Sequence, residues 1–151
     1  NAGLFAWELV TPGREASGER FDYEHLEIES RITVRGEPIA FEKMCIVPSL
    51  RSPSSPLELG RYRSFATLLV CRAGHPSASW RLLEKELTAL AAEWSVEDET
   101  VWGVSTLVAD GLIVRGLARE GRKLASSLPH FWRRAKGEIY DLEAILPRKI
   151  Y

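Results

Sequence analysis

Three histidines and two cysteines are the residues of this sequence best suited to metal or nucleophilic chemistry. His25, His75 and His130 lack the HxxxH and HExxH spacings of metal sites, and none stands at ligand spacing from a cysteine. Cys45 and Cys71 lie in the apolar runs MCIV and LLVCRA, so we expect buried free thiols in a reducing cytoplasm. Without a GxSxG elbow no nucleophile can be assembled. We predict no catalytic residues and no tightly bound cofactor.

Phosphate-binding loops are the next chemistry to consider. The segment from Gly111 to Gly116 lacks the Lys-Ser/Thr pair of a P-loop, and so does GREASGERF. Neither segment predicts a nucleotide site. If GTP takes part in the work of this protein, another chain must bind it.

Two carboxylates stand inside apolar strands: Glu8 in AGLFAWELV and Glu42 in IAFEKMCIV. Each either points outward to water or is buried with a partner. Glu42 and Lys43 must face opposite sides of a strand, so one of them is directed toward a less polar region. Nickel and similar divalent cations accept oxygen ligands. A row of inward carboxylates could therefore pass a divalent ion without trapping it.

The charges are balanced overall but segregated along the chain, with a formal net charge of -1. The segment 115–136 has seven basic residues against one acidic residue, whereas 84–99 has six acidic residues against one basic. Three interpretations are open: solvated helix faces, pairing of the two segments within the fold, or steering of protein partners. The near-neutral total argues against a nucleic-acid partner. No apolar run approaches the roughly 18 residues that a membrane span needs.

The first half of the sequence predicts strands. AGLFAWELV is one, and HLEIESRITV alternates apolar and charged residues with a period of two. Gly36 allows a tight turn, so residues 24–47 are expected to form an antiparallel hairpin. The proline- and serine-rich segment 48–61 predicts an exposed loop. RYRSFATLLVCRA then predicts a strand that is buried on both faces.

The second half predicts two helices around another hairpin. Residues 80–94 have apolar residues at helical spacing, with Ser79 as the N-cap. ETVWGVSTLVADGLIVRGLA predicts two short strands with a type I′ turn at Asp110-Gly111. The final helix, over 119–143, is expected to carry an apolar stripe and to be kinked or split by Pro129. The members of this stripe are Leu117, Leu124, Leu128, Phe131 or Trp132, and Ala135.

These elements predict an α+β, β-rich fold of antiparallel strands with two helices in the C-terminal half. The chain of 151 residues is expected to be a single domain. Its first part, 1–75, is strand-rich, and its second part, 76–151, holds both helices, the intervening hairpin and an extended tail.

Three groups of motifs, in order and spacing, resemble the C-terminal half of the urease accessory protein family UreD/UreH. A Trp-acidic pair leads into a GR-x-x-x-GE-x-F element. Later come a G-x-S-x-L and GL-x-VR-x-L element, a helix with a tryptophan, and a P-R tail. The matching residues are Trp7, Glu8, Gly13, Arg14, Gly18, Glu19, Phe21, Gly103, Ser105, Leu107, Gly111, Leu112, Val114, Arg115, Leu117, Trp132, Pro147 and Arg148.

The resemblance implies a function that the residues alone do not name. It implies a cytoplasmic, non-catalytic scaffold that binds UreF, through UreF the GTPase UreG, and apo-urease, within a dimeric assembly. Nickel would pass in transit to the urease active site, with Glu8 and Glu42 as candidates for lining its route. Arg14 and Glu19 become candidates for a structural ion pair or a partner contact. Family members are about twice as long, so the β-helix-like strand stack of the family would be incomplete here.

Two other functions remain open from the sequence. One is a β-rich protein-binding domain unrelated to urease. The other is a small metal-dependent hydrolase in which His25, His75 and Cys71 converge from different strands.

Overall fold

The computed structural model describes residues 2–14, 17–143 and 145. The described residues confirm a strand-rich α+β fold in which all strands pair antiparallel. The elements are β1 (Gly3–Val10), β2 (Leu26–Val34), β3 (Glu37–Ile46), β4 (Ser64–Arg72), α1 (Ser77–Trp94), β5 (Thr100–Thr106), β6 (Gly111–Ala118) and α2 (Gly121–Tyr140).

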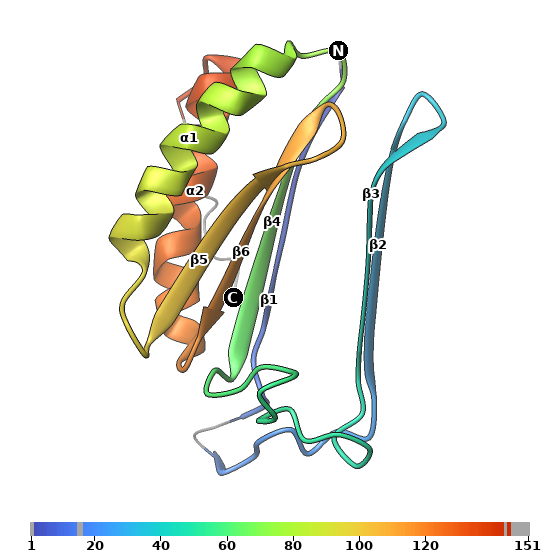
Figure 1. Ribbon diagram of the computed structural model, residues 1–151, viewed down its shortest axis with the longest axis vertical. Coiled ribbons are helices and arrows are strands. Elements are labelled where there is room, and N and C mark those ends of the chain that lie inside the picture. Colours follow the sequence, from blue (N-terminus) through green and yellow to red (C-terminus); the bar gives the residue numbers. More distant parts are fainter. Residues whose placement is uncertain (1, 15–16, 144, 146–151) are drawn as a thin grey trace.

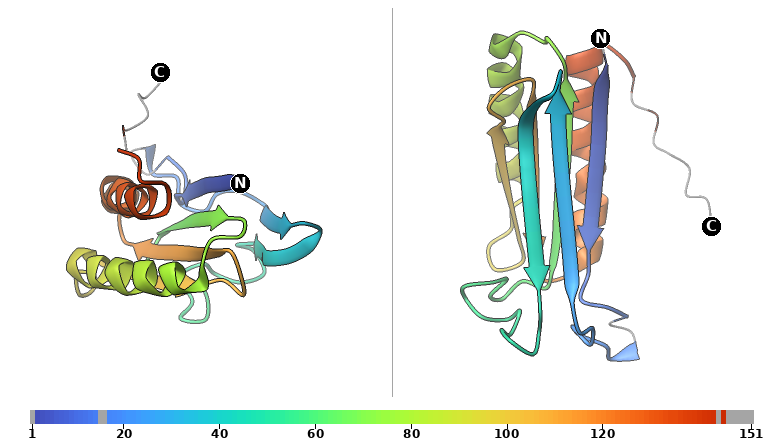
Figure 2. Two further views of the ribbon diagram at one scale, coloured as in Figure 1. Left: turned by 90° about the horizontal axis from the view of Figure 1, so that it is seen from above. Right: turned by 90° about the vertical axis from the view of Figure 1, so that its right-hand side faces the viewer.

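A four-stranded sheet of order β1-β4-β6-β5 is the centre of the molecule. Both helices cover one face of this sheet, and the β2-β3 hairpin stands on the side of its other face (Figures 1 and 2). Strand β4 is buried from Ser64 to Cys71, as its predominantly apolar sequence predicts. A central strand with neighbours on both sides and cover on both faces has no side to turn to water.

The first helix confirms the prediction for 80–94, with Trp80, Leu83 and Leu87 in the core beneath it. Its predicted start was wrong. Ser79 lies inside the helix, Pro76 is the N-cap residue, and no side chain caps the first turn. The reason is that a proline disfavours helical geometry in the residue before it, so the helix cannot extend back beyond Pro76.

The second helix runs unbroken from Gly121 to Tyr140 with Pro129 inside it, so of the two predicted outcomes, a kink or a split, the split was wrong. The proline removes one backbone hydrogen bond, at a cost of about 3 kcal/mol. Burial of Leu128 and Phe131 offsets this, since a fully buried side chain of that size contributes about 1.5–3 kcal/mol. Leu117, which we assigned to the helical stripe, lies in β6 instead.

The β2-β3 hairpin is confirmed and contains a β-bulge that sets its register. Arg35 and Gly36 at its turn have φ angles of 54° and 88°, as a type I′ turn requires. Val34 pairs with Glu37 at the turn, but beyond it the register shifts so that Ile32 pairs with Ala40. The shift puts Ile28 and Ile32 of β2 on the same face as Met44 and Ala40 of β3, which a hairpin without the bulge could not do.

The β5-β6 connection differs from the two-residue turn predicted at Asp110-Gly111. It spans residues 107–110, and the Leu107 amide donates a hydrogen bond to the Gly111 carbonyl at 2.9 Å. Only Asp110 of the predicted pair has a positive φ, 54°. Gly111 is required for another reason, because a Cβ there would lie 2.7 Å from the carbonyl oxygen of Val70.

Candidate functional site

A cleft of about 480 Å³ lies between the inner face of the β2-β3 hairpin and the uncovered face of the four-stranded sheet. We call it the hairpin cleft. It brings together the two carboxylates singled out from the sequence, Glu8 of β1 and Glu42 of β3. The residues that line it are Glu8, Ile28, Ser30, Glu42, Lys43, Met44, Leu59, Phe65, Ala66, Thr67, Val101, Trp102, Gly103, Arg115, Gly116 and Leu117.

Glu42 is directed into this cleft by the hairpin register. It lies opposite Ser30 of β2, and its side chain is 23% exposed. Lys43 is also part of the cleft lining, but it lies opposite Glu29 in the register and its ammonium forms an ion pair with Glu27 of the outer face at 3.1 Å. The expectation that one member of the Glu42-Lys43 pair faces a less polar region is met by Glu42.

Glu42 does not stand alone, because the guanidinium of Arg115 donates a hydrogen bond to it. Arg115 comes from β6, so this ion pair connects the hairpin to the main sheet. Glu8 lies opposite Thr67 of β4 and has no ion-pair partner among the described residues. The cleft thus combines a neutralised and an unpaired carboxylate. Such oxygens can contact a divalent cation, while the nearby arginine disfavours tight binding of a positive charge.

The GR-x-x-x-GE element forms a surface turn closed by an ion pair. The guanidinium of Arg14 donates two hydrogen bonds to the Glu19 carboxylate, at 3.0 and 2.6 Å. This contact lowers the pKa of the Glu19 carboxyl and raises that of Arg14. Gly13 and Gly18 have φ angles of 132° and 82°, and Phe21 has 56°. The motif residues therefore fix the path of the chain after β1.

Trp132 joins α2 to the edge strand β1. The residue is 8% exposed, and its ring meets Trp7 edge-on with the centroids 5.7 Å apart. The ammonium of Lys136 lies 5.2 Å from the Trp132 ring centroid. The motif residues of the C-terminal tail, Pro147 and Arg148, lie outside the described residues.

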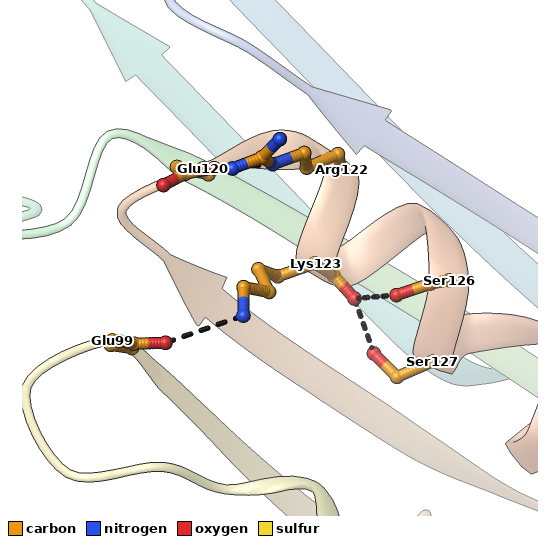
Figure 3. A network of polar contacts seen from close by, with 6 residues as sticks. All are labelled: Glu99, Glu120, Arg122, Lys123, Ser126 and Ser127. Carbon is orange, nitrogen blue, oxygen red and sulfur yellow. Dashed lines mark hydrogen bonds and ion pairs between the residues drawn. The ribbon is translucent and has the colours of Figure 1, made fainter.

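The segregated charges pair partly within the fold. Arg134 of α2 contacts Glu86 of α1 at 2.9 Å, and Lys123 reaches Glu99 at 3.4 Å. Figure 3 shows Lys123 extending toward Glu99, while its carbonyl accepts hydrogen bonds from the two serines of the next turn. These contacts favour the internal-pairing interpretation for the residues involved.

One group of potential metal ligands could not be recognised from the linear sequence. His25 Nε2 lies 3.4 Å from Cys45 Sγ and 3.9 Å from a carboxylate oxygen of Glu27, and all three side chains are exposed. The expectation of a buried Cys45 was wrong, because its side chain is exposed. Cross-strand register, and not linear spacing, brings these residues together.

The histidines and the other cysteine do not converge into a hydrolase site. Cys71 is buried as predicted. Its burial, and to a smaller extent the negative charge of Asp110, raise the pKa of its thiol to about 11. His75 is half-buried against Trp80, and His130 stacks on Trp94. Within the described part of the chain, the one group that could hold a metal is His25, Glu27 and Cys45.

The described residues form a β-rich α+β module with a cleft lined by two strand carboxylates. Comparisons with known proteins identify its family. The model of the family described as UreD urease accessory protein matches residues 1–150. The chain therefore belongs to the UreD family of urease accessory proteins. Neither helix in the described residues is long and apolar enough to cross a membrane.

Relatives with the same description match almost the whole chain. The urease accessory protein UreD of Herpetosiphon aurantiacus is 44% identical over 151 residues, 100% of this chain and 53% of that protein. UreD of Pseudomonas fluorescens is 34% identical over 148 residues, 98% of this chain and 49% of that protein. UreD 2 of Pseudomonas syringae is 28% identical over the same shares of the two chains. The chain spans about half the length of these relatives.

Proposed function

We propose that this chain belongs to a cytoplasmic scaffold that assists nickel insertion into urease. In this proposal the scaffold binds UreF, UreG through UreF, and apo-urease, in a dimeric assembly. Nickel is cargo and not a resident cofactor, and it moves along the hairpin cleft past Glu8 and Glu42. The observation that carries the proposal is that two strand carboxylates of a UreD-family chain line the same cleft.

The chemistry of the cleft suits transit. A passage must offer ligands that bind a cation weakly enough to release it, and the cleft provides two carboxylates from different strands. Arg115 forms an ion pair with Glu42 and also lines the cleft, so its positive charge raises the energy of a cation held there. Apolar residues such as Ile28 and Phe65 line other parts of the wall and offer a cation no ligand.

The test is co-purification of the protein with UreF, followed by nickel-dependent activation of apo-urease with and without it. We expect a stable complex and activation that requires the protein. Glu8→Gln and Glu42→Gln should each slow activation about tenfold, the equivalent of about 1.4 kcal/mol in the barrier to transfer.

Glu29→Gln is the matched control, since Glu29 is a strand carboxylate on the opposite face of the hairpin. Loss of activation in the control as well would mean that the effect is general and not specific to the cleft. A complex that activates urease normally with both cleft variants would refute the route while leaving the scaffold role standing. Absence of any complex would refute the scaffold role.

A further inference from the structure

The outer face of the β2-β3 hairpin, turned away from the hairpin cleft, carries three potential metal ligands at its open end. His25 directly precedes β2, Glu27 lies two residues later on the same face, and Cys45 of β3 pairs with Glu27 in the register. Each offers one ligand atom, and these atoms lie within 4.8 Å of one another. We call these three residues the outer cluster.

We propose that the outer cluster is a binding site for a divalent cation of borderline softness, such as Zn²⁺ or Ni²⁺. Imidazole nitrogen and thiolate sulfur favour these metals over Mg²⁺ and Ca²⁺, which prefer sites made of oxygen alone. The three protein ligands leave a fourth tetrahedral position for water or for a ligand from a partner. The inference does not depend on the route proposed through the cleft.

The distances fit this coordination. Metal bonds of about 2.0–2.1 Å to nitrogen, 2.3 Å to sulfur and 2.0–2.2 Å to oxygen place tetrahedral neighbours about 3.4–3.6 Å apart. The observed separations are 3.4 Å from His25 Nε2 to Cys45 Sγ and 3.9 Å from His25 Nε2 to Glu27 Oε2. Only small rotations of exposed side chains are needed to close the site around an ion.

The surrounding charges orient the carboxylate. Lys43 contacts Oε1 of Glu27 at 3.1 Å, which leaves Oε2 directed toward His25. Further along β2 on the same face, Glu29 forms an ion pair with Arg31 at 3.8 Å. Lys43 lowers the affinity for a cation, but the Cys45 thiol loses its proton on binding and supplies a compensating negative charge.

The test is titration of the purified protein with Zn²⁺ and Ni²⁺ by calorimetry, and with Co²⁺ by absorption. We expect one site per chain with a micromolar dissociation constant, proton release on binding, and a thiolate-to-cobalt charge-transfer band. Cys45→Ser should abolish the band. Cys45→Ser and His25→Ala should each weaken binding at least about tenfold, and Glu27→Gln should weaken it by a smaller factor.

Two controls keep the result interpretable. Glu29→Gln removes a carboxylate from the same face without touching the outer cluster, so affinity should be unchanged. The variants lie on an exposed face, and their circular dichroism and Tm should match the parent. Zn²⁺ should also protect Cys45 from alkylation. Binding that persists in the Cys45→Ser/His25→Ala double variant, or a missing charge-transfer band, would overturn the proposal.

Discussion

The contact between Gly116 and Trp102 gives the sharpest prediction about the stability of this fold. These residues pair across β5 and β6, and a Cβ on Gly116 would lie 2.5–2.7 Å from three atoms of the Trp102 ring. Ordinary carbon contacts are about 3.5–4.0 Å, so the ring must move by about 1 Å in Gly116→Ala. It cannot do so freely, because it is 6% exposed and packs on Phe131 with centroids 4.7 Å apart.

Overpacking of this kind costs about 2–3 kcal/mol when part of an aromatic contact is also lost. Replacing glycine in a strand returns about 0.5–1 kcal/mol by restricting the unfolded chain. The net loss is therefore about 1–2.5 kcal/mol, which lowers Tm by about 2–10 °C for a chain of this size. Thermal and urea unfolding followed by circular dichroism measure it.

Gly103→Ala is the matched control, since Gly103 lies next to Trp102 in β5 and a Cβ there meets nothing within 4 Å. It should leave Tm unchanged or raise it slightly. In a Trp102→Leu background, Gly116→Ala should become nearly neutral, because the ring that it strikes is gone. Equal destabilisation by Gly103→Ala and Gly116→Ala, or no rescue by Trp102→Leu, would refute the steric argument.

Three further predictions concern single sites. In native protein at pH 8 without metal, iodoacetamide should label the exposed Cys45 but not Cys71, because burial raises the pKa of the Cys71 thiol to about 11. Mass spectrometry that showed labelled Cys71 before unfolding would contradict this. Asp141 ends α2 at φ 51° and ψ 42°, so Asp141→Gly should raise Tm by about 2–3 °C while Asp141→Ala should not. Burial, and to a smaller extent the charge of Arg72, lower the pKa of His75. The neutral ring therefore contributes stability above about pH 6.5, and this stability is lost as the pH falls toward the folded pKa. His75→Gln should flatten this part of the curve of unfolding free energy against pH, and an unchanged curve would count against the argument.

The local elements were largely predictable from the residues. Period-two alternation identified β2, and the helical spacing of Trp80, Leu83 and Leu87 identified α1. Both signals are local, because they reflect which face of a single element is buried. The errors fell where local rules compete with packing. Helix α2 continues through Pro129. Gly111 is needed because β4 and β6 approach closely there, and not because its φ is positive.

The position of Glu42 in the cleft depends on a one-residue register shift in the β2-β3 hairpin. In a hairpin continued from the Val34-Glu37 pair without a shift, Glu42 would oppose Glu29 on the outer face, away from Glu8. The bulge moves the register by one residue, so Glu42 enters the cleft and Cys45 joins the outer face. Like charges directly opposite are unfavourable, whereas the observed register aligns the apolar faces and pairs Glu29 with Lys43.

By itself, then, the sequence determined the strand-rich α+β class, the hairpin, both helices and the candidate carboxylates, because each depends on residues close together in the chain. Only the tertiary structure decided that Glu8 and Glu42 share a cleft, that Arg115 reaches Glu42, and that His25 meets Cys45. These are contacts between separate strands, and their geometry depends on a one-residue register shift. Such a shift reverses the side that every following side chain faces.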